Sequence, residues 1–482
     1  SLPREYLRQL PKVADEDGSR CLRVASLATT LVADLRQPVD LEATHDLIDH
    51  YQEETILTTG ELWALPAVLR LSLLQRLASF AREALDQIRS GEEAESVGIA
   101  SIIISLRELR SFNWRGFVES LSRVERILEM DPAGAYRQMD FATRDRYRGV
   151  IEELSRGSES AEHRVAQCVV ELSEQDTEHS RQQHIGYYLI GEGRAQLDEA
   201  LAFHPDAGQR LRQILLRHPD TVYFATLGIF SLPILMALAI YLLTAGTSIG
   251  GTLLTVAIAA VPVIGLALAL VNGLITHSLP PRRLPKMDFS RGIPEEYRSA
   301  VVMPVLVADT DDIERNLQCL EMNYLNNGDR NLVYVMLSDF VDAQSQSTPG
   351  DQTLLQGLGN AIEALNQRYQ DGEGPSPFLA LHRERQWNAA EKCWMGWERK
   401  RGKLLEFNRL LKGHDDHGFT SCFGDRELLQ RIHFVITLDA DSQMPPATAA
   451  RLVATMAHPL NRLVIDSDGR RVIAGHGFLQ PR

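Results

Sequence analysis

The chain has 482 residues, too many for one hydrophobic core, and this length predicts two or three domains. Its formal net charge of −14 argues against a nucleic-acid partner, because such binding depends on neutralising phosphates with basic residues. The five cysteines form no Cys-x-x-Cys pair, which argues against a disulfide framework or a zinc ribbon and indicates a reducing, cytoplasmic environment. The sequence opens on Ser1 without an apolar leader, so we expect no signal peptide and a fragment of a longer polypeptide.

Residues 1–218 are rich in Leu, Arg, Glu and Ala, and their apolar residues recur at helical intervals. No strand-like alternation competes with this pattern. We therefore predict an all-helical cytoplasmic domain over residues 1–218. The clearest example is a run with steps of three and four, which predicts a buried stripe on one helix face: Val68, Leu69, Leu73, Leu77, Ala81, Ala84, Leu85 and Ile88.

Residues 219–278 are predicted to form two transmembrane helices. No Asp, Glu, Lys or Arg occurs between Thr221 and Thr276, and a glycine-rich break from Ala245 to Gly251 divides the stretch. Each half is long enough to cross a hydrocarbon core of about 30 Å. The alternative is a buried helical pair in a soluble protein. Basic residues flank both ends, which predicts that both ends lie in the cytoplasm: Arg210, Arg212, Arg217, Arg282, Arg283 and Lys286.

Residues 279–298, with Pro280, Pro281 and Pro285, are predicted to be a stiff linker. From residue 299 onward the pattern changes to short apolar runs of strand length separated by helical stretches. This alternation predicts a mostly parallel, Rossmann-like sheet, which binds ligands at the carboxyl ends of its strands. The predicted strands are Val301–Val307, Leu332–Leu337 and Ile432–Leu438.

Three Asp-x-Asp arrangements follow apolar runs: Asp309–Asp311, Asp439–Asp441 and Asp466–Asp468. The first precedes a helical pattern and is predicted to cap it. The third lies between two short apolar runs and is predicted to be a hairpin turn. Asp439 and Asp441 instead leave a strand without entering a cap sequence. Two hard carboxylates one residue apart can face a single Mg²⁺ or Mn²⁺, which would stabilise charge on a leaving diphosphate.

Two further residues fit a nucleotide-sugar site. Asp339 ends a predicted strand, where its carboxylate could accept hydrogen bonds from a uracil ring; the alternative is an ordinary strand-end turn residue. Lys403 follows a basic run at the start of a helical pattern, where its ammonium could meet a diphosphate; the alternative is a solvated helix face.

Several motifs give the chain a family resemblance. The stretch from Trp394 to Leu411, Asp439-Ala-Asp441 and the run from Met456 to Asn461 resemble cyclic β-1,2-glucan synthases of glycosyltransferase family 84. Upstream, the runs at 60–66, 139–148 and 186–190 resemble the helical region that precedes the transferase in that family. The resemblance covers essentially the whole chain.

This resemblance implies a GT-A-type glycosyltransferase domain that is incomplete at its C-terminus, over residues 299–482. It also implies an inverting transfer from UDP-glucose to a glucan acceptor, with Mg²⁺ or Mn²⁺, at the cytoplasmic face of the bacterial inner membrane. Asp339, Lys403 and Asp439 would bind the donor, and Asp439 with Asp441 the metal. Gln480 and Arg482 would lie near the acceptor.

The resemblance places the catalytic base C-terminal to Arg482, with further regions of the same polypeptide as partners. Tyr369 lies in an apparent insertion and is a candidate primer, although helix packing is the simpler role for a tyrosine. Two alternatives stay open: another processive polysaccharide synthase of the cellulose or hyaluronan type, and a non-catalytic membrane-anchored assembly module.

Overall fold

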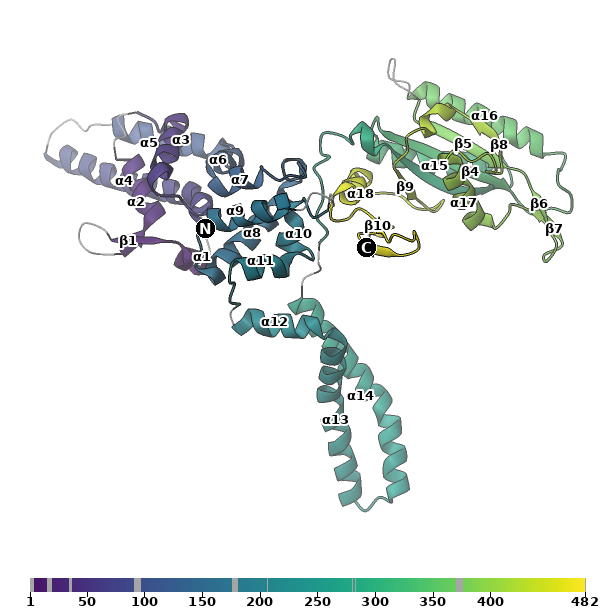
Figure 1. The fold of residues 1–482 in the computed structure, drawn as a ribbon, viewed down its shortest axis with the longest axis horizontal. Coiled ribbons are helices and arrows are strands. Elements are labelled where there is room, and N and C mark those ends of the chain that lie inside the picture. Colours follow the sequence, from purple (N-terminus) through teal and green to yellow (C-terminus); the bar gives the residue numbers. More distant parts are fainter. Residues whose placement is uncertain are drawn as a thin grey trace. The chain divides into compact units, whose positions relative to one another are not determined.

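The computed structural model describes residues 4–14, 20–33, 37–90, 97–175, 181–205, 207–279, 281, 283–369 and 376–481 (Figure 1). The chain divides into two compact units. Unit 1 comprises residues 1–130, 148–172 and 188–284, and unit 2 comprises residues 131–147, 173–187 and 285–482.

The N-terminal part of the chain is helical, as predicted. A short antiparallel pair, β1 (Lys12–Ala14) with β2 (Arg20–Leu22), is a correction to the all-helical prediction. Strands of three residues are too short to show the period-two alternation that identifies strands in a sequence. The helices are α1 Arg4–Gln9, α2 Arg23–Leu31, α3 Leu41–Glu54, α4 Thr59–Ser90, α5 Val97–Ser111, α6 Trp114–Leu121, α7 Arg123–Leu128, α8 Phe141–Ser158, α9 Glu162–Gln175, α10 Ile185–Ile190, α11 Arg194–Ala200 and α12 Ala207–Arg217.

The core of unit 1 forms around the first half of α4. Leu69 and Leu73 are fully buried there, together with side chains from α2, α5 and α6. The predicted apolar stripe is buried only in this half, because Leu85 and Ile88 are 55% and 62% exposed. The sequence pattern predicts a buried face along the whole of α4, but the second half of the helix extends beyond the core.

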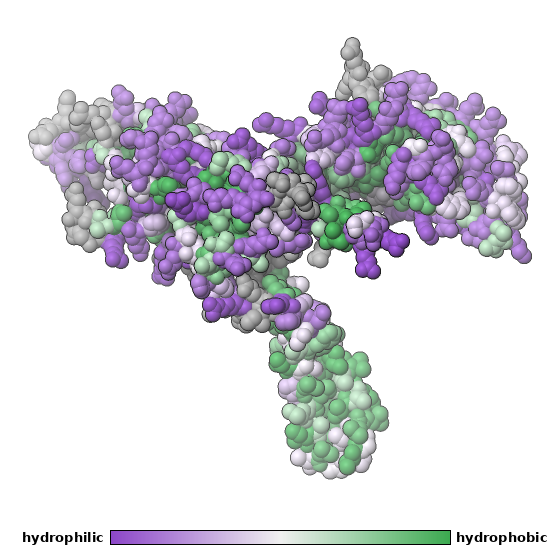
Figure 2. Space-filling model, in the orientation of Figure 1, coloured by the Kyte–Doolittle hydropathy of each residue, from purple (hydrophilic) through white to green (hydrophobic). Residues whose placement is uncertain are grey.

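Two long apolar helices follow, α13 (Pro219–Thr244) and α14 (Ile249–Ser278). Both helices are strongly apolar. In the most apolar stretch of each helix, only 6% (α13) and 11% (α14) of the residues are buried. Figure 2 shows a hydrophobic surface over both helices. Both are long and apolar enough to cross a membrane, and their exposure argues against a buried pair in a soluble core.

Unit 2 contains a five-stranded mixed sheet in the order β8-β5-β4-β3-β9. All neighbouring strands are parallel except β8, which pairs with β5 in the antiparallel direction. The mostly parallel sheet is thus confirmed. Its strands are β3 Ser299–Val307, β4 Leu332–Phe340, β5 Phe378–Arg383, β8 Phe419–Phe423 and β9 Phe434–Thr437.

Helices cover both faces of this sheet. Helices α15 (Thr310–Asn327) and α16 (Asp351–Arg368) pack on one face, where Tyr324 contacts Tyr334 and Phe378. Helix α17 (Arg399–Leu411) packs on the other face. There Phe407 is fully buried among alternate residues of β3, β4 and β5. The remaining elements are a hairpin of β6 (Gln386–Asn388) with β7 (Cys393–Met395), helix α18 (Thr448–Ala457), and a hairpin of β10 (Val464–Ile465) with β11 (Val472–Ala474).

Two stretches from the helical part of the sequence, residues 131–147 and 173–187, belong to unit 2. The first forms an isolated β-bridge with Met287. The second packs the buried His184 edge-to-face against His458, with ring centroids 5.1 Å apart. Composition along the chain cannot show this grouping, because it depends on contacts between residues far apart in sequence.

The two Asp-x-Asp arrangements predicted to be structural are confirmed as such. Asp309 is the N-cap of α15, and its Oδ1 accepts a hydrogen bond of 2.8 Å from the Asp312 amide. Asp466 lies in the turn between β10 and β11, where its Oδ1 accepts from the amides of Arg470 and Arg471.

Candidate active site

The candidate site lies where the sheet reverses its strand order. From β3 the chain proceeds through β4 and β5 on one side, whereas β9 pairs with β3 on the other. Crevices at the carboxyl ends of such a pair are the usual ligand sites of parallel sheets. Asp339 is the last residue but one of β4 and Asp439 follows β9, so both carboxylates come from this edge of the sheet.

Asp339 forms a buried bidentate ion pair with Arg383, its register partner on β5. Arg383 Nε donates to Asp339 Oδ1 at 2.8 Å, and Nη2 donates to Oδ2 at 2.7 Å. The two side chains are 1% and 2% exposed. Asp339 therefore directs both carboxylate oxygens to an arginine of its own chain.

Helix α17 adds one charge of each sign to this pair. Lys403 Nζ lies 3.2 Å from Asp339 Oδ2 and donates to the carbonyl of Val305 in β3. Glu406, one turn further along α17, accepts from Arg383 Nη1 at 2.6 Å. Two carboxylates and two cations thus form a buried electroneutral cluster, which offsets the desolvation of each charge.

The carboxylates of the cluster and burial have opposite effects on the pKa of its two cations. Burial lowers the pKa of Lys403, and the neighbouring Asp339 carboxylate counteracts only part of this effect. Burial also acts to lower the pKa of Arg383, but its hydrogen bonds and attraction to Asp339 and Glu406 outweigh burial and raise it. Arg383 therefore stays charged, and Lys403 is the member more easily deprotonated.

Two glycines allow the chain to pass close to this cluster. A Cβ at Gly396 would meet Asp339 Oδ2 at 2.3 Å, and a Cβ at Gly402 would meet the Trp397 carbonyl oxygen at 1.9 Å. The same carbonyl accepts from Arg383 Nη1 at 3.2 Å. Glycine is therefore a steric requirement at Gly396 in the loop between β7 and α17 and at Gly402 within α17.

Asp439 and Asp441 lie on the loop after β9 and are exposed to solvent. The Asp439 side chain is 63% exposed, and its Oδ1 accepts a hydrogen bond from Lys400 Nζ. Lys400 and Lys403 belong to the same turn of α17. One turn of helix therefore links Asp439 to Asp339, so the structure connects the two predicted carboxylate sites.

Asparagines of α15 hold the loop that carries Asp439 and Asp441. The fully buried Asn323 donates to the Ser442 carbonyl at 3.1 Å and accepts from the Met444 amide at 2.8 Å. Asn327, one turn further along the helix, accepts from the Ala449 amide at 3.0 Å. These contacts fix the loop's backbone and leave its carboxylates free to face solvent.

The Asp439–Asp441 pair fits a divalent cation by its donor chemistry. Both side chains offer hard oxygen ligands on the solvent-exposed side of a fixed loop, as suits Mg²⁺, which usually keeps several water ligands. A cation, the Lys400 ammonium, already lies at Asp439. The pair can therefore accommodate positive charge.

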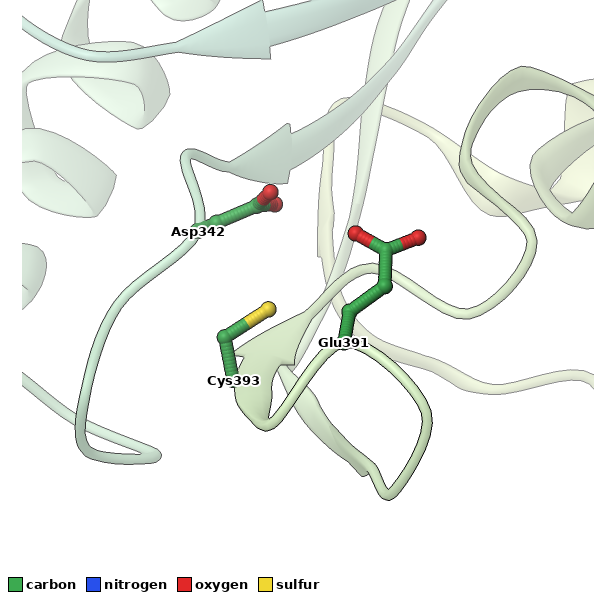
Figure 3. Close-up of side chains that lie close together, drawn as sticks. All are labelled: Asp342, Glu391 and Cys393. Carbon is green, nitrogen blue, oxygen red and sulfur yellow. The ribbon is translucent and has the colours of Figure 1, made fainter.

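A different acidic cluster lies near the exit of β4. Figure 3 shows Asp342, Glu391 and Cys393, whose ligand atoms lie within 4.8 Å of one another. Arg399 Nη2 contacts Asp342 Oδ2 at 2.9 Å and Glu391 Oε2 at 3.0 Å. Partial desolvation and the two carboxylates raise the pKa of the Cys393 thiol, which disfavours the thiolate that metals prefer. Arg399 thus acts as the counter-ion of this cluster.

Of the remaining predicted residues, Tyr369 does not join the Asp339 and Asp439 sites. Tyr369 follows α16 near the amino ends of the strands, where its hydroxyl donates to Glu321 at 2.7 Å and its ring packs on Phe378. Gln480 is exposed on the final described segment. Arg482 lies outside the described residues.

Sequence reasoning missed Arg383, Glu406, Lys400 and Asn323. One signal for Arg383 was available, since the apolar run Phe378–Leu381 ends in charged residues just as the run ending at Asp339 does. Two such ends on neighbouring parallel strands meet at one edge of the sheet. No comparable local pattern identifies this role of Asn323, because Ser442 and Met444 are more than a hundred residues away in the sequence.

The chain is similar to one curated bacterial protein along its whole length. It is 29% identical to the cyclic beta-(1,2)-glucan synthase NdvB of Rhizobium meliloti (strain 1021) over 566 aligned positions, covering 100% of this chain. The chain spans 20% of the length of that relative. No protein-family model matches the chain. The similarity confirms the resemblance to cyclic β-1,2-glucan synthases that the motifs indicate.

Proposed function

We propose that this chain is the donor-binding, membrane-anchored part of a glucosyltransferase that moves glucose from UDP-glucose to a growing β-1,2-glucan. The similarity to a cyclic glucan synthase supports this function. The mostly parallel sheet with acids at its carboxyl ends supports a GT-A-like domain. The chain then works at the cytoplasmic face of a bacterial inner membrane, anchored by α13 and α14.

One observation carries the proposal. Lys400 and Lys403, in one turn of α17, contact Asp439 and Asp339 respectively. Asp339, near the end of β4, and Asp439, just after β9, are thereby connected at the point where the sheet reverses its strand order. A nucleotide would bind there, across the end of β3. A local cap or an isolated turn residue would not produce this connection.

Each residue has a distinct task in the proposed reaction. Asp339 and Lys403, both buried, support the uridine side of the site from beneath, with Asp339 oriented by Arg383. Asp439 and Asp441 hold Mg²⁺ or Mn²⁺, which when bound supplies positive charge to the leaving diphosphate. Lys400 is exposed beside Asp439 and stabilises the same negative charge. An acceptor hydroxyl attacks the anomeric carbon from the opposite face, so an α-linked donor gives a β-linked product.

The test uses the intact synthase that carries this chain, in membranes, with UDP-glucose and Mn²⁺. Asp439→Asn and Asp441→Asn should each abolish release of UDP. Asp468→Asn is the matched control, because this exposed aspartate of a second Asp-x-Asp lies in a hairpin turn. Full activity in both site variants would overturn the site assignment. A β-1,4-linked product would indicate a synthase of the cellulose type instead.

A further inference from the structure

The hairpin of β6 and β7 presents tryptophan side chains to solvent beside the candidate site. Trp387 on β6 is 53% exposed, and Trp397, just after β7, is 37% exposed. Trp394 pairs with Trp387 across the hairpin, with ring centroids 5.9 Å apart and planes inclined by 60°. Trp387 and Trp397 line one hollow of about 470 Å³. Large aromatic surfaces left in contact with water are typical of binding sites.

The hairpin is fixed to the end of β4. Trp394 exchanges two backbone hydrogen bonds with Ala343, of 2.8 and 2.9 Å. Arg399 joins Asp342, on the segment after β4, to Glu391, in the hairpin turn. Because Arg383 also donates to the Trp397 carbonyl, the backbone that carries the Trp397 indole is tied to the buried Asp339–Arg383 pair. The hollow is therefore a fixed extension of the candidate active site.

Backbone strain is concentrated in the same segment. Lys392, Glu398 and Arg399 have φ of 52°, 50° and 48°, although none is glycine. Such conformations are unfavourable for side chains with a Cβ and persist only where the surroundings impose them, which is common at binding sites. Here they turn the chain sharply on either side of Trp394 and Trp397.

The chemistry of the hollow fits a sugar chain. Flat indole faces pack against the C–H faces of pyranose rings, while amides and carboxylates at the rim bond to hydroxyls. Gln386, Asn388 and Glu398 provide such groups around Trp387 and Trp397. The cation in the hollow, Arg399, is neutralised by Asp342 and Glu391, so the site offers little to a phosphate.

We propose that the β6–β7 hairpin and Trp397 form a binding platform for the glucan acceptor, in which Trp387 and Trp397 stack on successive glucose units. This subsite rests on the proposed glucosyltransferase function. The platform would hold the acceptor chain next to the carboxyl end of β4.

The experiment measures binding of a linear β-1,2-linked gluco-oligosaccharide to the purified 482-residue chain in detergent, by calorimetry and without UDP-glucose. Trp387→Ala and Trp397→Ala should each weaken binding about tenfold or more, because each removes an aromatic stacking surface. Trp387→Phe should retain most of the affinity. Leu325→Ala, which removes from α15 an apolar side chain about as exposed as Trp387, should leave the affinity unchanged.

Thermal unfolding of every variant shows whether the hairpin has kept its fold. UDP binding is measured on the same samples. It tests the donor site of the proposed function independently of the acceptor platform. Trp-dependent oligosaccharide binding without UDP binding supports the platform and contradicts the donor site. Oligosaccharide affinity that both alanine variants keep, with unchanged thermal stability, overturns the platform. Equal loss of affinity in Leu325→Ala would also overturn it.

Discussion

Asp339 and Arg383 face each other across neighbouring parallel strands and close a bidentate ion pair that solvent hardly reaches. The pair lies at the carboxyl edge of the sheet, where β4 and β5 end. Its position gives it two roles. It neutralises a carboxylate that would otherwise be expensive to bury, and through the Trp397 carbonyl it positions the loop before α17.

Removing the arginine should destabilise unit 2 strongly. Arg383→Met leaves Asp339 and Glu406 buried, with Lys403 near Asp339 as the remaining cation of the cluster, and breaking a buried pair in this way costs about 3–5 kcal/mol. The thermal midpoint of the detergent-solubilised chain should fall by several degrees. Arg401→Met is the control, since Arg401 is 84% exposed and makes only a surface ion pair. An equal shift in the two variants would contradict the role given to the buried cluster.

Asn323→Ala should reduce function more than it reduces stability. The substitution removes hydrogen bonds to Ser442 and Met444 and leaves backbone groups without these partners, which costs about 1–3 kcal/mol. The loop bearing Asp439 and Asp441 then loses its anchor to α15. We expect KM for UDP-glucose and the Mn²⁺ requirement to rise in the intact synthase, while expression persists. Gln367→Ala, on an exposed position of α16, should change neither quantity.

Acid should destabilise unit 2 through His382. Burial lowers the pKa of this side chain to about 4, although the Asp339 carboxylate acts in the opposite direction. Unfolded histidine titrates near 6.5, so between about pH 6.5 and 4 the unfolded state binds the proton and the folded state does not. Stability should therefore fall as the pH decreases through this window, by roughly 3 kcal/mol from this residue.

The measurement is the thermal midpoint of wild type and of His382→Gln as a function of pH. The variant cannot titrate, so its midpoint should fall less steeply below pH 6.5. Part of the slope should remain, because burial also lowers the pKa of His458. His50→Gln, at an exposed position, should follow wild type. A pH profile of His382→Gln identical to that of wild type would rule out this contribution.

The sequence predicted those features that depend on local patterns. The uncharged stretch identified α13 and α14, and the apolar runs identified β3, β4 and β9 with ends that differ by at most three residues. Local hydrogen bonding likewise explains why Asp309 was recognisable as a helix cap.

Features that depend on strand register or distant contacts could not be predicted. Arg383 lies opposite Asp339 only because β5 pairs with β4 in one particular register. Asn323 meets Ser442 only because α15 packs beside the loop after β9. The end of α4 is a case in which a local pattern misleads. Ile88 continues the apolar stripe of the helix but is exposed, because no partner surface covers it among the described residues.

An arginine in the apolar hairpin should prevent stable membrane integration. Met236 lies within α13 and is 62% exposed, which is costly in water but favourable in lipid. Met236→Arg would place a charge in the hydrocarbon core, which opposes insertion by about 3 kcal/mol. We expect less of this variant to remain in carbonate-washed membranes. Met130→Arg alters a methionine that is similarly exposed, at 57%, but precedes the predicted spans, so it should fractionate like wild type. If α13 were a helix of a soluble interface, neither variant would depend on membranes and both would appear in the soluble fraction.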